Sequence, residues 1–317
     1  MSRMSTDPMA GARALPRRSV NGATMGARYA AVFHAPETLA TETVAAALFA
    51  AVDRVDRQMS NWKPESDLNR LNAAPVGTWV DMPPELLAVL AEALRIGGAS
   101  DGAFDIGVGA LVSAWGFGPA GQVPDPQRIQ AAAAELRMGA AQALQLDMAG
   151  RRARKAAPLA LDLCGIAKGF GVDEMARVMD THGVGAWLLG IDGEMRARGT
   201  KPDGEAWAVA HERPDRHARG PMGVIELHDR AVATSGTYRH WIDMGDRIVS
   251  HTMRPVSGAP LENGIASVTV MAPTCMAADA WATALLVRGV EDGLALATRH
   301  GLDVIFVLDD GAIRSSL

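Results

Sequence analysis

Cysteine, aromatic residues and long apolar runs are all scarce in this chain of 317 residues. Its two cysteines, Cys164 and Cys275, have neither CxxC spacing nor the spacing of a zinc-ligand set, so we expect free thiols. No apolar run reaches the roughly 18 residues that a membrane-spanning helix needs. The formal net charge of −5 argues against a basic nucleic-acid-binding surface.

The N-terminal segment lacks the features of a secretory signal. It contains the arginine pair Arg17 and Arg18, but no apolar segment follows this pair. We therefore expect residues 1–18 to be a disordered lead-in. We expect the chain as written to stay in the cytoplasm, or to act in the periplasm if an export signal has been removed.

The central segment 160–179 lacks the two common phosphate-binding motifs, GxxxxGK[ST] and GxGxxG. It does have an apolar run that predicts a strand, then Asp162, two glycines with Lys168 between them, and a helical pattern. Glycine allows close backbone approach, and the free N–H groups at a helix start attract anions. The segment is therefore a candidate site for anionic oxygen, although a plain strand–turn–helix unit is the more common explanation of this pattern taken alone.

The rest of the chain predicts an α+β fold. Apolar residues at three- and four-residue spacing predict helices, and short apolar or alternating runs predict strands. The best-defined helices are 41–59, 84–98 and 275–287, and the best-defined strands are 19–34, 186–191, 265–271 and 303–308. Groups of strands separated by long helices favour α+β over a doubly wound parallel sheet.

Two polar side chains in the helix 275–287 are candidates for a metal site. Asp279 and Thr283 are four residues apart and therefore project from one helical face. A carboxylate and a hydroxyl are oxygen ligands of the kind that Mg²⁺ prefers. The alternative is structural, with Asp279 stabilised by the helix dipole and Thr283 bonded to its own helix.

His251 and Trp62 are candidates on loops. His251 follows a predicted strand and precedes a loop rich in Pro and Gly, where a histidine can face a cleft and accept a proton. Trp62 lies in a polar turn, where it either forms part of a ligand site or is buried by packing. Neither residue is conclusive alone.

Seven segments, in this order along the chain, resemble the signature blocks of the ApbE family, the FAD:protein FMN transferases. They are ATMGARY (23–29), MSNWKPESDLNRLN (59–72), DGAFDIGVGALVSAWGFG (101–118), LDLCGIAKGFGVD (161–173), VATSGTYRH (232–240), SHTMRPVSG (250–258) and AADAWATAL (277–285). One block alone would be a weak signal, but seven in register are specific.

The resemblance implies an α+β, T-fold-like architecture in which mixed or antiparallel sheets pack with helices. Residues 19–317 would form one domain, with a flavin cleft between two intertwined subdomains. The family uses FAD as substrate and Mg²⁺ as cofactor. It transfers FMN to a threonine hydroxyl of an acceptor protein, such as a subunit of a membrane redox complex, and releases AMP.

Site residues follow from matching the family's motifs to this chain. The positions implied to contact FAD are Met25, Trp62, Gly102, Ala103, Phe104, Asp162, Lys168 and Met253. The positions implied to hold the metal are Asp279 and Thr283, with backbone oxygens from Gly165 and Ala282. The resemblance implies that His251 is the base and that Asp279 is essential for catalysis.

One departure from the family pattern lies close to His251. Arg254 stands where the family usually has an aspartate, so we expect no carboxylate there, and contact with phosphate is an alternative role for Arg254. Two other activities fit the same residues. One is an Mg²⁺-dependent FAD pyrophosphatase that yields FMN and AMP, and the other is a non-catalytic FAD-binding protein.

Overall fold

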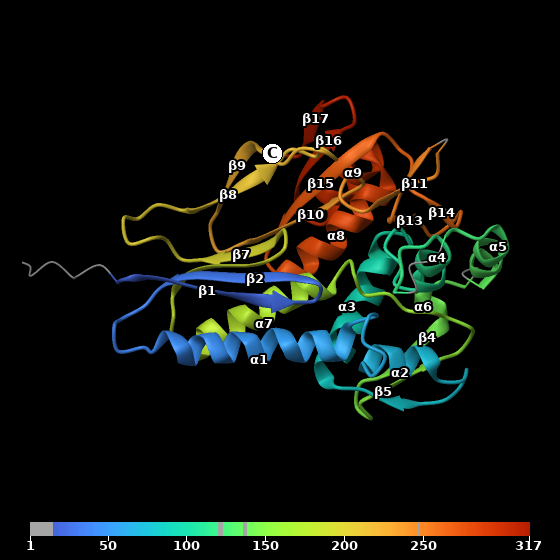
Figure 1. The fold of residues 1–317 in the computed structure, drawn as a ribbon, viewed down its shortest axis with the longest axis horizontal. Helices are drawn as coiled ribbons and strands as arrows, with labels where there is room; N and C mark the ends of the chain where they lie inside the picture. Colours follow the sequence, from blue (N-terminus) through green and yellow to red (C-terminus); the bar gives the residue numbers. More distant parts are fainter. Residues whose placement is uncertain (1–14, 120–122, 136–137, 246) are drawn as a thin grey trace, which may run out of the picture.

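The computed structural model describes residues 15–119, 123–135, 138–245 and 247–317. The expected lead-in lies largely outside these residues. The α+β class is confirmed, because an eight-stranded, fully antiparallel sheet packs against helices (Figure 1). In sheet order its strands are β1 (Arg17–Thr24), β2 (Ala27–His34), β6 (Ala186–Ile191), β7 (Glu194–Arg198), β10 (Ala231–Gly236), β15 (Ile265–Ala272), β16 (Asp303–Leu308) and β17 (Ile313–Ser315).

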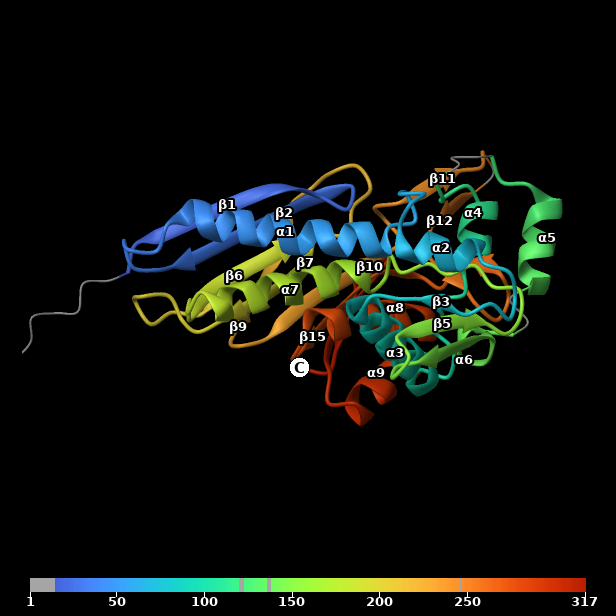
Figure 2. The same ribbon diagram turned by 90° about the horizontal axis from the view of Figure 1, so that it is seen from below.

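Long helices cover one face of this sheet and bury the main core. Figure 2 shows α1 and α7 running side by side, with α8 and α9 further along the sheet. Their bounds are α1 (Thr41–Met59), α7 (Ala167–Thr181), α8 (Cys275–Arg288) and α9 (Val290–Arg299). β15 is buried at every position, because the helices cover one face and further strands cover the other.

A two-stranded ribbon covers part of the opposite face (Figure 1). It consists of β8 (Trp207–Glu212) and β9 (Pro221–Leu227). Trp207 and Leu227 from the ribbon are buried with Val232 and Met271 from the sheet. The loop 213–220 joins the two strands and leads toward the second part of the molecule.

Shorter elements form this second part between α1 and α7 and after β10. They are α2 (Asp67–Ala73), α3 (Pro84–Ala99), α4 (Gly109–Ala114), α5 (Pro126–Glu135), α6 (Ala140–Ala143), the sheet of β3 (Val80–Asp81), β5 (Arg152–Lys155) and β4 (Leu144–Asp147), and the hairpins β11 (Trp241–Asp243)–β12 (Ile248–Ser250) and β13 (Met253–Arg254)–β14 (Ala259–Pro260). No helix in the described ranges is both long and apolar enough to cross a bilayer.

The strongest periodic segments match the expectations, and two expectations were wrong. α1, β6 and β16 have the expected bounds. The expected strand 19–34 is instead a hairpin that starts at Arg17 and turns at Met25–Gly26, where both residues have positive φ, of 46° and 69°. The apolar run before Asp162 is not a strand, since only an isolated bridge joins Ala160 to Val108.

Gly169 tests how closely α7 and α8 approach. A Cβ at this position would lie 2.3 Å from the carbonyl oxygen of Cys275. Overpacking of this kind costs about 1–3 kcal/mol, more than the roughly 0.5–1 kcal/mol that alanine gains over glycine in a helix. We therefore expect Gly169→Ala to lower the free energy of unfolding in urea.

Gly98, near the end of α3, is the matched control, because a Cβ there would meet no atom within 4 Å. We expect Gly98→Ala to leave the free energy of unfolding unchanged or to raise it by up to about 1 kcal/mol. Equal effects of the two substitutions would show that the helices do not approach this closely.

Candidate functional site

The N-terminal turns of α7 and α8 cross, and each helix places a carboxylate on the start of the other. Asp279 of α8 accepts a hydrogen bond from the Gly169 N–H of α7 at 3.0 Å. Asp173 of α7 accepts from the N–H groups of Cys275 and Met276 at 3.0 and 2.9 Å. The free N–H groups and positive dipole end of a helix favour such contacts. The sequence predicted that α7 begins at an anion site, and the structure places Asp279 there.

Thr283 lies beside Gly165, and Asp279, one helical turn before Thr283, lies beside Gly169. A Cβ at Gly165 would lie 3.1 Å from Thr283 Oγ1, a tight contact, so glycine at this position keeps the backbone close to the hydroxyl. Thr283 Oγ1 lies 2.9 Å from Ser235 Oγ. Asp279 is only 4% exposed, and burial, reinforced by the charge of Glu194, raises the pKa of its carboxyl group well above its usual range.

The donor set fits a small, hard cation. Asp279 Oδ2 accepts the hydrogen bond from the Gly169 N–H, whereas Oδ1 has no hydrogen-bond partner among the described residues. Oδ1 is not among the fully buried oxygens that lack a partner, so it borders open space, where a carboxylate oxygen suits a hard cation. The described ranges contain no cluster of three or more His, Cys, Asp or Glu placed to hold a metal, so the site rests on one carboxylate with hydroxyl and backbone oxygens. Ala282 is fully buried next to Thr283.

Lys168 lies beside the same cluster, one residue before Gly169. Its Nζ is 2.8 Å from Glu194 Oε1 and 3.5 Å from Asp192 Oδ2. Burial lowers the pKa of Lys168, but the charges of Glu194 and Asp279 outweigh burial and hold the pKa well above its usual range. Lys168 is therefore charged, and its charge is shared by several carboxylates.

Asp162 lies on the wall of a cavity of about 560 Å³. Its Oδ2 accepts from Asn61 Nδ2 at 2.8 Å, and its Oδ1 accepts from the Cys164 N–H at 2.7 Å. α2, α4 and α5 contribute much of the rest of the wall, in which small apolar residues predominate over the asparagines and Ser113. Asp162 thus connects this cavity to the segment that carries Gly165.

Trp62 is next to Asn61 and is 63% exposed, which excludes the alternative of a buried packing residue. The side-chain amide of Asn69 in α2 anchors the loop around Trp62. Asn69 Nδ2 lies 3.4, 3.0 and 2.9 Å from the carbonyl oxygens of Ser60, Asn61 and Lys63. An exposed indole on an anchored loop presents a flat apolar surface to a ligand.

Three asparagines near this cavity were missed in the sequence. Asn61 holds Asp162, Asn69 holds the Trp62 loop, and Asn72 exchanges two hydrogen bonds with the Leu161 backbone, at 3.0 and 2.7 Å. The only local signal was their recurrence in the segment 59–72, without any indication of their partners.

Two groups of the other predicted FAD contacts lie against glycines at the start of α7, Phe104 at Gly165 and Met25 at Gly171. Phe104 is 5% exposed, and its ring would lie 3.3 Å from a Cβ at Gly165. Gly102 precedes it at a φ of 75°, a conformation that favours glycine, and Ala103 is buried between the two. Met25 lies at the β1–β2 turn, and its Cε would lie 2.9 Å from a Cβ at Gly171.

His251 directly follows β12, and one of its ring nitrogens forms a hydrogen bond. Its Nδ1 is 3.3 Å from the His240 carbonyl oxygen, which can only accept, so Nδ1 carries the proton and Nε2 is the unprotonated nitrogen. Burial and the nearby His240 lower the pKa of His251 to about 4, so the ring is neutral at pH 7. Phe117 packs edge-on against it at 6.3 Å, and Met253 is buried two residues further on.

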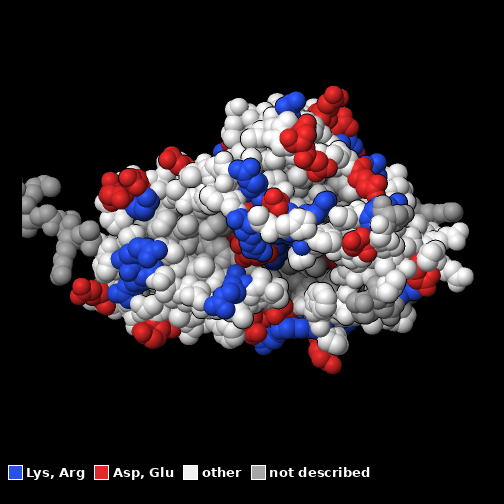
Figure 3. Space-filling model, turned by 45° about the horizontal axis from the view of Figure 1, so that its top comes forward, with Lys and Arg blue, Asp and Glu red and all other residues white. Residues whose placement is uncertain are grey.

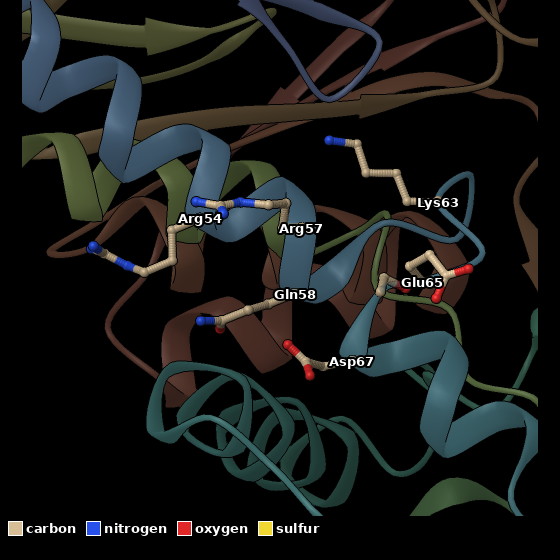
Figure 4. A pocket seen from close by; sticks show the side chains of 7 residues that line it. Arg54, Arg57, Gln58, Lys63, Glu65 and Asp67 are labelled. Atoms are coloured by element: carbon tan, nitrogen blue, oxygen red, sulfur yellow. The ribbon is translucent and has the colours of Figure 1, made fainter.

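A second cavity, of about 400 Å³, lies between the end of α1 and the start of α2. Figure 4 shows its charged lining side chains. Most are already paired, with Lys63 2.7 Å from Asp56 and Arg57 2.9 Å from Asp53. None of the predicted site residues lines it. Its charges are matched within the protein, so it is the weaker candidate for a ligand site.

Comparisons with known proteins agree on one family. The model of the ApbE family matches residues 25–306. The FAD:protein FMN transferase of Klebsiella pneumoniae is 33% identical over 92% of this chain and 84% of its own length, and that of Vibrio cholerae is 34% identical over 92% and 88%. The apo flavinyl transferase ApbE of Pseudomonas stutzeri has a TM-score of 0.84 at 35% identity, covering 96% of this chain and 97% of its own. The solved flavin transferase ApbE of Vibrio cholerae has a TM-score of 0.84 at 33% identity, covering 95% and 97%.

Asn69 tests whether the Trp62 loop is anchored as described. Its amide has two protons for three carbonyls, and each net hydrogen bond contributes about 0.5–1.5 kcal/mol. We therefore expect Asn69→Ala to lower the free energy of unfolding by about 1–3 kcal/mol. We also expect faster hydrogen–deuterium exchange of the backbone amides of residues 60–65.

Asn21 is the control, because its side chain contacts only Arg28 on the exposed β1–β2 hairpin. Asn21→Ala should change stability by no more than about 0.5 kcal/mol and leave exchange in residues 60–65 unaltered. An unchanged exchange pattern in Asn69→Ala would mean that the loop is held by other contacts.

Proposed function

The chain belongs to the ApbE family, and we propose that it transfers the FMN half of FAD to a threonine hydroxyl of an acceptor protein and releases AMP. The observation that carries the proposal most directly is the oxygen cluster formed by the buried Asp279, the half-buried Thr283 and the Gly165 backbone. Its position beside the wall formed by Phe104 and the predicted FAD contacts supports a site for a dinucleotide. The curated relatives are named FAD:protein FMN transferases.

The reaction breaks one P–O bond and forms another. The threonine oxygen attacks the FMN phosphorus, AMP leaves with the electron pair of the broken bond, and a phosphoester remains. A bound Mg²⁺ would offset the negative charge of the pyrophosphate. Asp279, Thr283 and Gly165 would hold it with oxygen ligands, which suit this ion.

The proton of the threonine hydroxyl would go to His251. The Nδ1–H of this ring is directed to the His240 carbonyl oxygen, which leaves Nε2 to accept. The ring is neutral at pH 7 and therefore already in the form that a base requires. Trp62, Met25 and Met253 supply the apolar contacts for the flavin and adenine rings in this proposal.

Asp279→Asn tests the metal site and the reaction together. Asparagine retains an acceptor for the Gly169 N–H but loses the charge, so we expect the fold to persist. We expect the weakened metal site to cost several kcal/mol of transition-state stabilisation. This loss corresponds to a decrease of at least about 100-fold in the rate of labelling. The measurement is covalent flavin fluorescence of a threonine-containing acceptor in a denaturing gel, with AMP quantified in parallel over a range of Mg²⁺ concentrations.

The same assay separates the three activities considered. A fluorescent acceptor with AMP indicates transfer, AMP without a fluorescent acceptor indicates hydrolysis, and neither product indicates a binding protein. Thr283→Ser is the conservative control, since it retains a hydroxyl, and we expect it to keep most of the activity. Because ligation requires the ionised carboxylate, the Mg²⁺ requirement should rise as the pH falls. Labelling by Asp279→Asn at the wild-type rate would contradict the metal assignment.

His251→Asn tests the base. General base catalysis contributes about 10²–10⁴-fold, so we expect kcat to fall within that range while the Kd for FAD changes little. In the wild type, protonation of His251 removes the base, so kcat should fall on the acid side with a limb near pH 4. This limb should be absent from the residual activity of His251→Asn, and its persistence would assign it to another group.

A further inference from the structure

The loop 213–220, between β8 and β9, carries a concentration of positive charge that the proposed reaction does not use. Arg213, Arg216 and Arg219 are all exposed, and none forms an ion pair with another described residue. The loop's one acidic residue, Asp215, accepts from the backbone N–H groups of His217 and Ala218 at 2.8 and 3.0 Å. We call residues 213–220 the basic loop.

The basic loop lies at the approach to His251. At its start, Glu212 accepts from Tyr238 Oη at 3.4 Å and forms an ion pair with Arg239, the two residues before His240. His240 in turn contacts the His251 ring, at 5.2 Å between centroids.

A second contact fixes the middle of the loop. His217 packs edge-on against Trp241 at 6.5 Å, and Trp241 pairs across the β11–β12 hairpin with Ser250, the neighbour of His251. In Figure 3, Lys and Arg side chains gather near the middle of the face that includes this region. The loop is therefore held beside the approach to His251 at two points.

We propose that the basic loop docks an acidic segment of the acceptor protein, so that the acceptor's threonine reaches His251. This inference rests on the proposed function, which requires a protein hydroxyl at His251. The basic loop has three exposed arginines and one aspartate, whose carboxylate is hydrogen-bonded within the loop. It therefore forms a local cationic surface on a chain whose net charge is −5. Complementary charge of this kind steers association and selects partners. The alternative is that the same arginines attract the anionic FAD rather than the acceptor protein.

Peptide binding tests the inference without catalysis, and so distinguishes its failure from failure of the proposed function. The probes are two fluorescein-labelled 12-residue peptides with a central threonine, one flanked by aspartates and the other by lysines. We expect the full-length protein to bind the acidic probe, and we expect Arg216→Glu/Arg219→Glu to weaken that binding about 10-fold. The lysine probe should not bind, and about 0.5 M salt should abolish the difference.

The control is Arg151→Glu/Arg299→Glu, which makes the same charge change at two other exposed arginines, on the β4–β5 turn and the last turn of α9. Figure 2 shows α9 on the side opposite to β11. We expect this variant to bind the acidic probe like the wild type and both variants to bind FAD equally. Equal weakening by both variants, binding of both probes alike, or a matching loss of FAD affinity in Arg216→Glu/Arg219→Glu would overturn the proposal.

Discussion

The exchange of carboxylates between the starts of α7 and α8 is the interaction on which the site depends. Each helix presents unpaired N–H groups at its first turn, and each receives a buried carboxylate from the other helix. The exchange requires close approach, which Gly169 allows because a side chain there would meet the Cys275 carbonyl. Lys168 precedes Gly169, and Thr283 is one turn beyond Asp279. This crossing therefore sets the positions of the oxygen cluster and of the Lys168 ammonium group beside it.

The two carboxylates are alike in burial but differ in how completely they are paired. Asp173 has two backbone N–H donors and an ion pair with Arg196 at 2.7 Å. Asp279 has one backbone donor. Burial raises the pKa of both groups, but only Asp279 has an oxygen without a hydrogen-bond partner among the described residues. A buried carboxylate whose two oxygens both have hydrogen-bond or ion-pair partners has a structural role. A carboxylate with one unpaired oxygen is suited to bind a cation.

The sequence predicted features that depend on local spacing and missed those that depend on distant contacts. Periodicity predicted α1 with its bounds, and four-residue spacing placed Asp279 and Thr283 on one face. No local pattern indicated that Asn61 would bond to Asp162, 101 residues away, or that Gly169 would bond to Asp279, 110 residues away. The likeness to a family supplied the site residues, and the geometry adds that a side chain at Gly165 would press against Thr283 and Phe104.

The charges around Lys168 favour a cation at the oxygen cluster over direct binding of pyrophosphate. Lys168 contacts Glu194 and Asp192 and is close enough to Asp279 for their charges to interact, so one ammonium group faces three carboxylates. Arg239 lies 3.2 Å from Asp192 but also pairs with Glu212, so carboxyl groups outnumber basic groups around Lys168. A pyrophosphate entering this cluster would meet repulsion that Lys168 alone does not offset. In the proposed reaction Asp279 would hold the divalent ion, whose charge would offset that of the pyrophosphate, and Lys168 would hold Glu194 and Asp192 in place.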